Sequence, residues 1–153
     1  MNGHLSDSHL SAWLRLARAG QGCLGAIEAD LKAAGHPPLL WYDVLLELRR
    51  APRGRLLHSE IGGKISLSKS NVTRVVDRLE AKELVRREAC RKDRRSAFVI
   101  ITEAGRALQK RMWPDYRASL ARHVGACLSE EEAGQLAALL GRLGCIAGTA
   151  AIR

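Results

Sequence analysis

Apolar residues recur at helical spacing along most of the chain. The repeat covers residues 9–34, then residues 39–50 after a break at a GHPP segment, and later residues 103–124 and the segment that follows Ser129. Apolar side chains at positions i, i+3, i+4 and i+7 lie on one face of a helix. The pattern therefore predicts a mainly helical protein. Pro114 falls inside one of the later helices and is expected to bend it, because proline lacks the backbone N–H.

The middle of the chain, residues 59–105, has a different arrangement. A short helix is predicted over residues 60–65, where Gly62 would allow close packing against a neighbour. A second helix follows Ser68, whose hydroxyl can accept an N–H of the first turn. The apolar face of this second helix consists of Val72, Val75, Val76 and Leu79. Two short helices joined by a tight turn predict a helix-turn-helix, whose second helix fits the major groove of DNA.

Two segments rich in branched residues follow that helix and predict two strands, at residues 84–88 and 97–101. The residues between them, ACRKDRRS, are polar and strongly basic, and Thr102 can cap the next helix. Residues 55–57 are expected to add a third short strand. A helix-turn-helix followed by a hairpin with a cationic tip is a winged helix. The expected fold class is mainly α with a small β wing, in which terminal helices flank the winged helix-turn-helix.

Four motifs in a fixed order make this region resemble the MarR family, the multiple-antibiotic-resistance-type bacterial repressors. The motifs are VDRLE from Val76, LVRR from Leu84, DRR from Asp93 and ITEAG from Ile101. Glu83 stands where the family pattern has a glycine, so we expect a less tightly turned helix exit there.

The resemblance also implies how the chain is divided. It implies a single domain over residues 1–153, with residues 9–34 and 103–150 as dimerisation helices and residues 39–102 as the winged helix-turn-helix. A chain of 153 residues with 46% apolar residues is long enough to form one such core.

Double-stranded DNA with a pseudo-palindromic operator is the partner that the resemblance implies. The second helix of the helix-turn-helix and the wing tip would supply the contacts, from Ser68, Lys69, Ser70, Asn71, Thr73, Arg74, Arg78, Arg91, Lys92, Asp93, Arg94 and Arg95. We expect Arg74 and its helix neighbours to face bases or nearby phosphates in the major groove. Arg95 is expected to enter the minor groove, held by Asp93 through a charge-assisted hydrogen bond.

The distribution of charge agrees with this interpretation. The net charge is +9, and residues 49–95 hold 15 Lys and Arg against 6 Asp and Glu. That segment alone therefore accounts for the whole excess of positive charge. A phosphate-binding surface requires such clustering, whereas an ordinary solvated surface would have no reason to coincide with the motifs.

The terminal helices carry apolar stripes that need a partner. In the last helix, which a capping box at Ser129 and Glu132 would start, the stripe consists of Leu136, Leu139, Leu140, Leu143 and Ile146. Gly20, Gly22 and Gly25 weaken the first helix, but small residues also let another backbone approach closely. The resemblance implies that the partner is a second copy of the chain, which gives a triangular homodimer.

In this family a small, often aromatic or anionic molecule binds where the dimerisation helices meet the winged helix-turn-helix. Its binding changes the distance between the two helices of the dimer that enter the major groove. The residues that could form such a site are Trp13, Arg15, Arg18, His36, Trp41, Tyr42, Asp43, Trp113 and Tyr116. These aromatic side chains could equally be ordinary core. The main hypothesis is therefore a repressor released by an effector, and an effector-independent architectural DNA-binding protein is the alternative.

The four cysteines and five histidines form no recognisable metal or disulfide pattern. There is no C-x-x-C motif and no histidine pair at i, i+4, so we expect neither a metal site nor another cofactor. Cys90 lies beside Arg91 and Lys92, where cations favour the thiolate, and this keeps a thiol-based redox-responsive regulator as a further alternative. Peroxide-sensing relatives, however, carry their cysteine early in the first helix, about where this chain has Leu14.

No arrangement of residues typical of an enzyme is found. A Ser/His/Asp order, a phosphate-binding glycine loop and a paired-carboxylate motif are all missing, and Asp77 and Glu80 are interpreted as charges on a helix face. Residues 1–8 are expected to form a loose tail. They do not resemble a signal peptide, and no apolar run approaches the ~20 residues that cross a bilayer. We therefore expect a cytoplasmic protein with no membrane partner.

Overall fold

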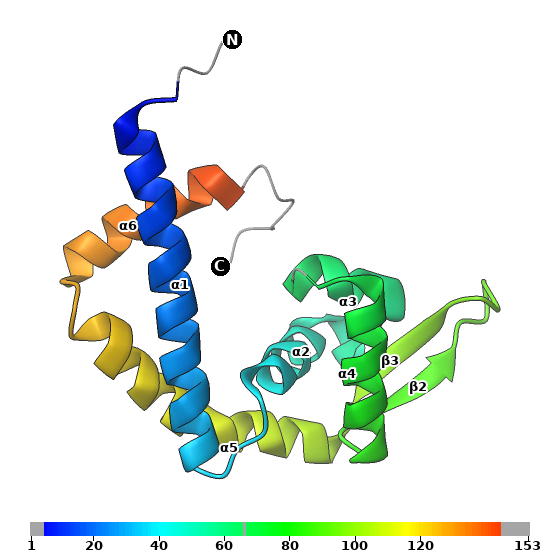
Figure 1. Cartoon of the computed structure of the whole chain (residues 1–153). Coiled ribbons are helices and arrows are strands. Elements are labelled where there is room, and N and C mark those ends of the chain that lie inside the picture. The colour runs from blue at the N-terminus through cyan, green and yellow to red at the C-terminus, as the bar shows by residue number, and fades with distance from the viewer. Residues whose placement is uncertain (1–4, 66, 145–153) are drawn as a thin grey trace.

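The computed structural model describes residues 5–65 and 67–144. The helices are α1 (Asp7–Ala33), α2 (Leu39–Arg50), α3 (His58–Ile65), α4 (Lys69–Ala81), α5 (Glu103–Leu120) and α6 (Glu130–Gly144). The strands are β1 (Arg55–Leu57), β2 (Val85–Ala89) and β3 (Ala97–Ile101), and two short helical turns complete the chain, η1 (Pro52–Gly54) and the π-helical η2 (Ala121–Gly125). The expected mainly helical fold with a small wing is confirmed (Figure 1).

Several boundaries differ from the prediction by a few residues. The first helix begins at Asp7 because Ser6 forms a capping box with His9: the Ser6 hydroxyl accepts the His9 N–H at 3.3 Å, and His9 Nδ1 accepts the Ser6 N–H at 3.2 Å. The prediction of a loose tail up to residue 8 is therefore wrong for residues 6–8, and residues 1–4 lie outside the described part. The helix α3 begins at His58 rather than at residue 60.

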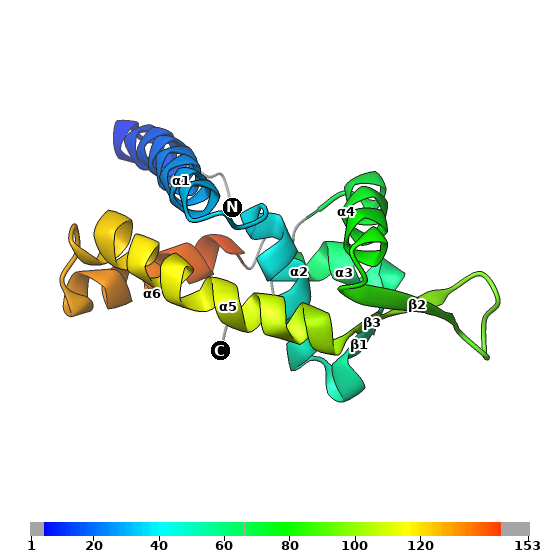
Figure 2. The same ribbon diagram turned by 90° about the horizontal axis from the view of Figure 1, so that it is seen from below.

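The three strands form one antiparallel sheet in the order β1-β3-β2. Leu56 of β1 and Arg87 of β2 both lie opposite Val99 of the central strand β3. Leu56, Val85 and Val99 are buried, so one face of the sheet is part of the core. The sheet extends from the helices as a wing, with the β2–β3 tip at its far end (Figure 2).

The core lies mostly inside the winged helix-turn-helix. The apolar stripe of α4 packs there with side chains of α2, α3 and the sheet. The fully buried residues of this core include Leu45, Leu48, Ile61, Val76, Leu79 and Val99. Gly62 is needed for close approach, because a Cβ at this position would lie 2.8 Å from the Leu67 carbonyl oxygen. The turn between α3 and α4 is therefore tight, as the sequence predicted.

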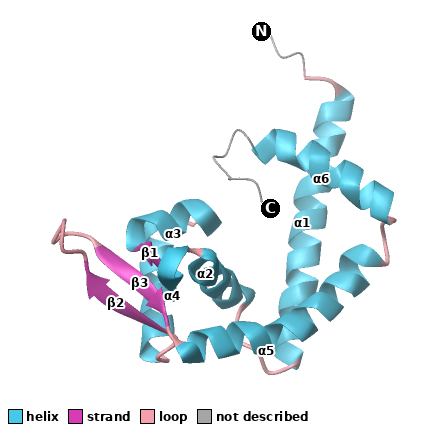
Figure 3. Cartoon of the chain, turned by 180° about the vertical axis from the view of Figure 1, so that it is seen from behind, coloured by secondary structure: helices cyan, strands magenta, loops and turns pink. Residues whose placement is uncertain are grey.

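The terminal helices lie at the end of the molecule opposite the wing (Figures 1 and 3). In α1 only Ile27 and Leu31 are buried, and both belong to its last two turns. No described residue of α6 is buried. Even its apolar residues Leu139 and Leu143 are each 55% exposed. Ile146, the last residue of the predicted stripe, lies outside the described residues. Much of the apolar surface of these helices is therefore uncovered in a single chain.

The helix α5 connects the two ends of the molecule. The Thr102 hydroxyl caps it by accepting the Gly105 N–H at 3.1 Å, and Pro114 lies inside it. The axis of α5 changes direction along its length in Figure 1, as a proline inside the helix would produce. No helix among the described residues is long and apolar enough to cross a membrane.

Candidate nucleic-acid interface

The outward face of α4 carries cations that have no acidic partner. Ser68 caps the helix by accepting the Asn71 N–H at 3.4 Å, so the first turn is fixed. Lys69, Ser70, Asn71, Arg74 and Arg78 are all exposed, whereas Val72, Val75 and Val76 of the same helix are buried. In the described part of the chain, none of the three cations among them forms an ion pair. They are free to bind phosphates.

Thr73 differs from these residues because its hydroxyl is already used inside the protein. It donates to the Lys69 carbonyl oxygen at 3.1 Å and lies 3.5 Å from His58 Nε2. His58 is partly shielded from solvent and lies near the positive charge of Arg87, and both effects lower the pKa of its imidazole. The neutral imidazole can therefore stay beside the hydroxyl. Thr73 is exposed, and its hydroxyl lies between the Lys69 carbonyl of its own helix and the ring of His58 in α3.

Asp77 and Glu80, which the sequence suggested were simple helix-face charges, are both bound by Arg87 of β2. The guanidinium donates from Nη2 to Asp77 Oδ1 at 2.5 Å and from Nη1 to Glu80 Oε2. The backbone N–H of Arg87 also donates to Glu80 Oε1, at 3.2 Å. Desolvation opposes the charge of Arg87, but the bonds to the two carboxylates outweigh it and raise its pKa.

The sequence analysis missed this network. Its only sequence signal is the spacing of the two acids, three positions apart and hence on one side of the helix. Nothing in the sequence identifies which of the many arginines would bind them.

At the wing tip Asp93 organises the turn through the backbone. Its Oδ1 accepts the backbone N–H of Arg95 at 2.9 Å, and its Oδ2 accepts the Ser96 hydroxyl at 2.7 Å. These two bonds lower the pKa of the Asp93 carboxyl. The expected charge-assisted bond therefore exists, but it fixes the main chain of Arg95 and not its guanidinium. The side chains of Arg91, Lys92, Arg94 and Arg95 are exposed, and none is ion-paired within the described residues.

The exit of α4 is as tight as a glycine would allow, contrary to the expectation from Glu83. Glu83 adopts a φ of 57°, in the left-handed region. Its N–H donates to the Glu80 carbonyl at 2.8 Å and the Leu84 N–H donates to the Leu79 carbonyl at 2.9 Å, which together form a Schellman turn. The packing of Leu84 and Val85 against the core holds the turn despite the Cβ of Glu83.

Three of the aromatic residues suggested for an effector site form a cluster between α2 and α5. The ring of Tyr42 lies 6.3 Å from that of Trp113 and 5.1 Å from that of Tyr116, measured between centroids. Asp43 is half-buried near this cluster, and burial together with the charges of Glu28 and Glu47 raises its pKa to about 6.

Two further candidates border the same junction. His36 Nε2 is bound to Asp115 Oδ2 at 2.7 Å, which ties the end of the α1–α2 loop to α5. Trp41 is half-buried against the core beside the α2 residues described above.

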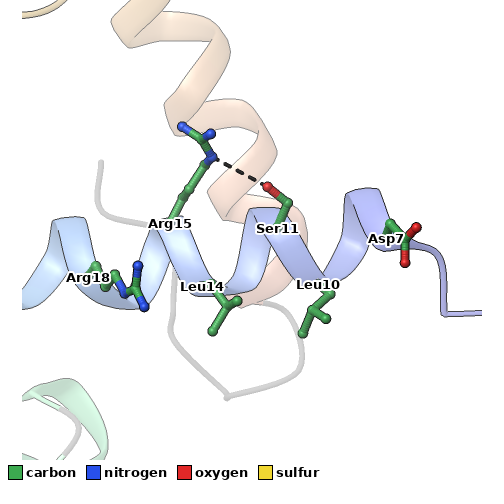
Figure 4. Close-up of a pocket in the computed structure, with 6 residues that line it drawn as sticks. All are labelled: Asp7, Leu10, Ser11, Leu14, Arg15 and Arg18. Atoms are coloured by element: carbon green, nitrogen blue, oxygen red, sulfur yellow. Dashed lines mark hydrogen bonds between the residues drawn. The ribbon is translucent and has the colours of Figure 1, made fainter.

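Trp13, Arg15 and Arg18 do not join this cluster within one chain. They lie on the exposed first half of α1, where Trp13 is 62% exposed. Arg15 and Arg18 border a shallow open cavity of about 630 Å³, and the Arg15 Nε donates to the Ser11 hydroxyl at 3.4 Å (Figure 4). Among the described residues, those that line this cavity all belong to α1, namely Asp7, Leu10, Ser11, Leu14, Arg15 and Arg18.

The described residues contain no group of three or more His, Cys, Asp and Glu side chains that could hold a metal ion. Cys23 and Cys90 are half-buried and Cys127 is exposed, and all three are free. Cys145 and His4 lie outside the described residues.

Comparison with known proteins relates this geometry to one family. A sequence model described as "MarR family" matches residues 35–96. The "Uncharacterized HTH-type transcriptional regulator YkoM" of Bacillus subtilis is 34% identical over 115 residues, which cover 75% of this chain and 72% of YkoM. The "HTH-type transcriptional regulator MhqR" of the same organism is 42% identical over 85 residues, or 56% of this chain, and the match spans only 58% of MhqR.

Among solved structures, Sco3205 from Streptomyces coelicolor has the same fold. It is described as a MarR family transcriptional regulator in complex with DNA, and it superposes with a TM-score of 0.84 at 24% identity. The superposition covers 94% of this chain and 90% of Sco3205, so the likeness includes the terminal helices as well as the wing.

Proposed function

This chain belongs to the MarR family of DNA-binding transcriptional regulators, not to an enzyme family, and we propose that it is a homodimeric repressor released from its operator by a small molecule. In this proposal residues 39–102 form the reading module. Residues 9–34 and 103–150, of which 145–150 lie outside the described part, form the dimerisation helices of the same single domain.

The observation that carries the DNA-reading part is the separation of charge on the module. The cations of the outward face of α4 and of the wing tip have no acidic partners in the described chain, while Asp77, Glu80 and Asp93 are all engaged in bonds within the protein. A surface on which cations are free and acids are occupied is suited to phosphates. The proposed contacts are Ser68, Lys69, Ser70, Asn71, Thr73, Arg74, Arg78, Arg91, Lys92, Asp93, Arg94 and Arg95.

The uncovered faces of α1 and α6 support the homodimer. Monomeric proteins seldom expose contiguous apolar surface on two whole helices, and most soluble oligomers are closed two-fold dimers. The exposed apolar side chains of these helices include Leu10, Trp13, Leu14, Leu24, Leu136, Leu139 and Leu143. A second copy would cover them and would supply an opposite wall for the cavity that, among the described residues, only α1 borders. Two-fold symmetry then predicts operator half-sites about one helical turn, roughly 34 Å, apart.

The experiment that tests this function starts from a random-sequence duplex library. The wild-type protein should select a pseudo-palindromic duplex, sediment as a dimer, and protect two half-sites in register. Arg95→Ala should weaken binding to the selected duplex substantially and leave the melting temperature nearly unchanged, since Arg95 is exposed and forms no ion pair with any described residue. Protection without register would favour an architectural protein, and a stable monomer would contradict the dimer.

The junction of α2 and α5 supports the effector part of the proposal. Tyr42, Trp113 and Tyr116 supply stacking surfaces beside the half-buried Asp43. A carboxylate near Glu28 and Glu47 disfavours an anion at this position, so an aromatic ligand that is neutral or cationic there fits better than an anionic one. CouR from Rhodococcus jostii RHA1, which shares this fold at 23% identity with a TM-score of 0.71, is described bound to p-coumaroyl-CoA.

Aromatic amines, phenols and aromatic acids should be titrated in parallel, with tryptophan fluorescence and affinity for the selected duplex followed together. A ligand that releases DNA tenfold must favour the released state by about 1.4 kcal/mol, and DNA must weaken the ligand by the same factor. Fluorescence quenching without any change in DNA affinity would establish binding but contradict the switch.

A further inference from the structure

We infer that Arg87 is a positioning residue for operator reading, which fixes the orientation of α4 and occupies both of its carboxylates without contacting the DNA. The inference rests on the DNA-reading function proposed above. Arg87 is not among the DNA contacts expected from the sequence, although it lies in the strongly basic segment between α4 and the wing tip.

Arg87 reaches from β2 to two points on α4, Asp77 at 2.5 Å and Glu80, while its backbone N–H also binds Glu80. The two acids lie about one turn apart on the same side of the helix. Two anchors on one side restrict rotation of the helix about its axis and sliding along it. The apolar stripe of α4 restricts these motions less, because hydrophobic packing is not directional.

The sheet supports the side chain of Arg87. Val85 and Arg87 point to the same face of β2, toward α4, and Val85 is buried. The Arg87 side chain is 28% exposed, compared with 59% for the Arg86 side chain on the opposite face. Arg87 is therefore held by the sheet as well as by its two acids, and it transmits the position of the wing to the recognition helix.

Arg87 also compensates the negative charge of α4. Asp77 and Glu80 are the only acids in α4, and both bind this single guanidinium. A free carboxylate on a helix in the major groove would repel the phosphates at the groove edges. Because Arg87 occupies both acids, the outward face presents the charges of Lys69, Arg74 and Arg78 without opposition.

The test compares Arg87→Met with a matched control, Arg86→Met. Arg86 is the adjacent residue in the same strand and bears the same charge, and among the described residues it pairs only with Glu88, at 2.9 Å on the other face. Affinity is measured for the duplex that the wild-type protein selects and for an unrelated duplex of equal length. Their ratio is the readout, because a general loss of charge weakens both duplexes alike. Melting curves confirm that each variant is folded at the assay temperature.

We expect Arg86→Met to weaken both duplexes by a similar small factor and to keep the ratio. Arg87→Met should lower the ratio about tenfold, the scale of one misplaced base contact. The variant Arg87→Met with Asp77→Asn and Glu80→Gln should regain affinity for the unrelated duplex but keep the lowered ratio, because the repulsion is removed and the anchors are still missing.

An Arg87→Met ratio equal to that of Arg86→Met would overturn the inference, and so would full recovery of the ratio in the triple variant. If Arg87→Met melts below the assay temperature, Arg87→Lys takes its place. Lysine keeps the charge, but it cannot offer the planar fork that reaches two carboxylates, so the ratio should still fall. An unchanged ratio for Arg87→Lys would contradict positioning. Failure of the wild-type protein to select any duplex would instead refute the proposed function.

Discussion

Replacing Glu83 by glycine should stabilise the protein, because Glu83 occupies a backbone conformation that a Cβ disfavours. Its φ of 57° lies in the left-handed region, where a residue with a Cβ costs roughly 1–2 kcal/mol. Glycine would remove that cost. Its greater conformational freedom in the unfolded chain, however, lowers the stability of the fold by about 0.5–1 kcal/mol. The Schellman bonds use only main-chain atoms and would remain.

The side chain of Glu83 adds a second, smaller contribution. A carboxylate at the C-terminal end of α4 faces the negative end of the helix dipole, which costs about 0.3–1 kcal/mol. No hydrogen bond or ion pair of this side chain is present in the described structure, so its removal sacrifices nothing. The two effects together predict a net stabilisation of about 1 kcal/mol for Glu83→Gly.

Urea unfolding at a fixed protein concentration measures this change as a higher midpoint with an unchanged m-value. For a chain of this length, 1 kcal/mol corresponds to a rise in melting temperature of about 2–4 °C. Glu83→Ala is the matched control, because it removes the charge and keeps the Cβ, and it should give only the smaller dipole contribution. Equal stabilisation by alanine and glycine would refute the argument from the backbone.

Two further predictions follow from the wing and from the α2–α5 junction. Asp93→Ala should weaken binding to the selected duplex several-fold, even though it removes a negative charge, because the turn that orients Arg95 loses two bonds; tighter binding in an affinity titration would contradict this. Asp43→Asn should stabilise the protein at pH 7.5 by about 1–2 kcal/mol, a figure already reduced for the partial exposure of Asp43. Near pH 4 the same substitution should have almost no effect on stability. The sign follows because the raised pKa of about 6 makes the folded state bind more protons than the unfolded state, so wild-type stability falls as pH rises from about 4 to 6. A stability difference independent of pH in urea titrations would show that the Asp43 charge is not its cause.

Local patterns were enough to predict most of the elements. The helix of Val72, Val75, Val76 and Leu79 and its Ser68 cap were found correctly because periodicity and capping depend on residues close together in sequence. The third strand at residues 55–57 was also predicted correctly.

The exit of α4 was not predicted correctly. A glutamate in the left-handed region is intrinsically unfavourable. The tertiary packing of the residues that follow it stabilises this backbone conformation. Propensity describes the isolated segment, so it could not reveal this compensation.

The candidate site was predicted less completely than the fold. Exposed cations of α4 and the wing could be named from the motifs, but the bonds of Arg87 to Asp77 and Glu80 depend on how β2 folds back against the helix. The same limit applies to Trp13. It was grouped with Tyr42 because both are aromatic, but it lies on the exposed first half of α1 and not in the aromatic cluster. Contacts between distant segments require the three-dimensional arrangement.

That arrangement constrains how a ligand at the junction would act on DNA. Asp30 near the end of α1 accepts bonds from Ser119 at 2.5 Å, Arg122 at 2.8 Å and His123 at 2.8 Å, and these bonds hold its pKa far below the usual range. Arg49 of α2 also binds Gln109 of α5, at 2.6 Å. The end of α1, α2 and α5 are thus fastened to one another by charged bonds. Because α4 is in turn fastened to the wing, we expect a ligand between α2 and α5 to act by changing the angle between the reading module and the terminal helices of the proposed dimer, and not by loosening the recognition helix alone.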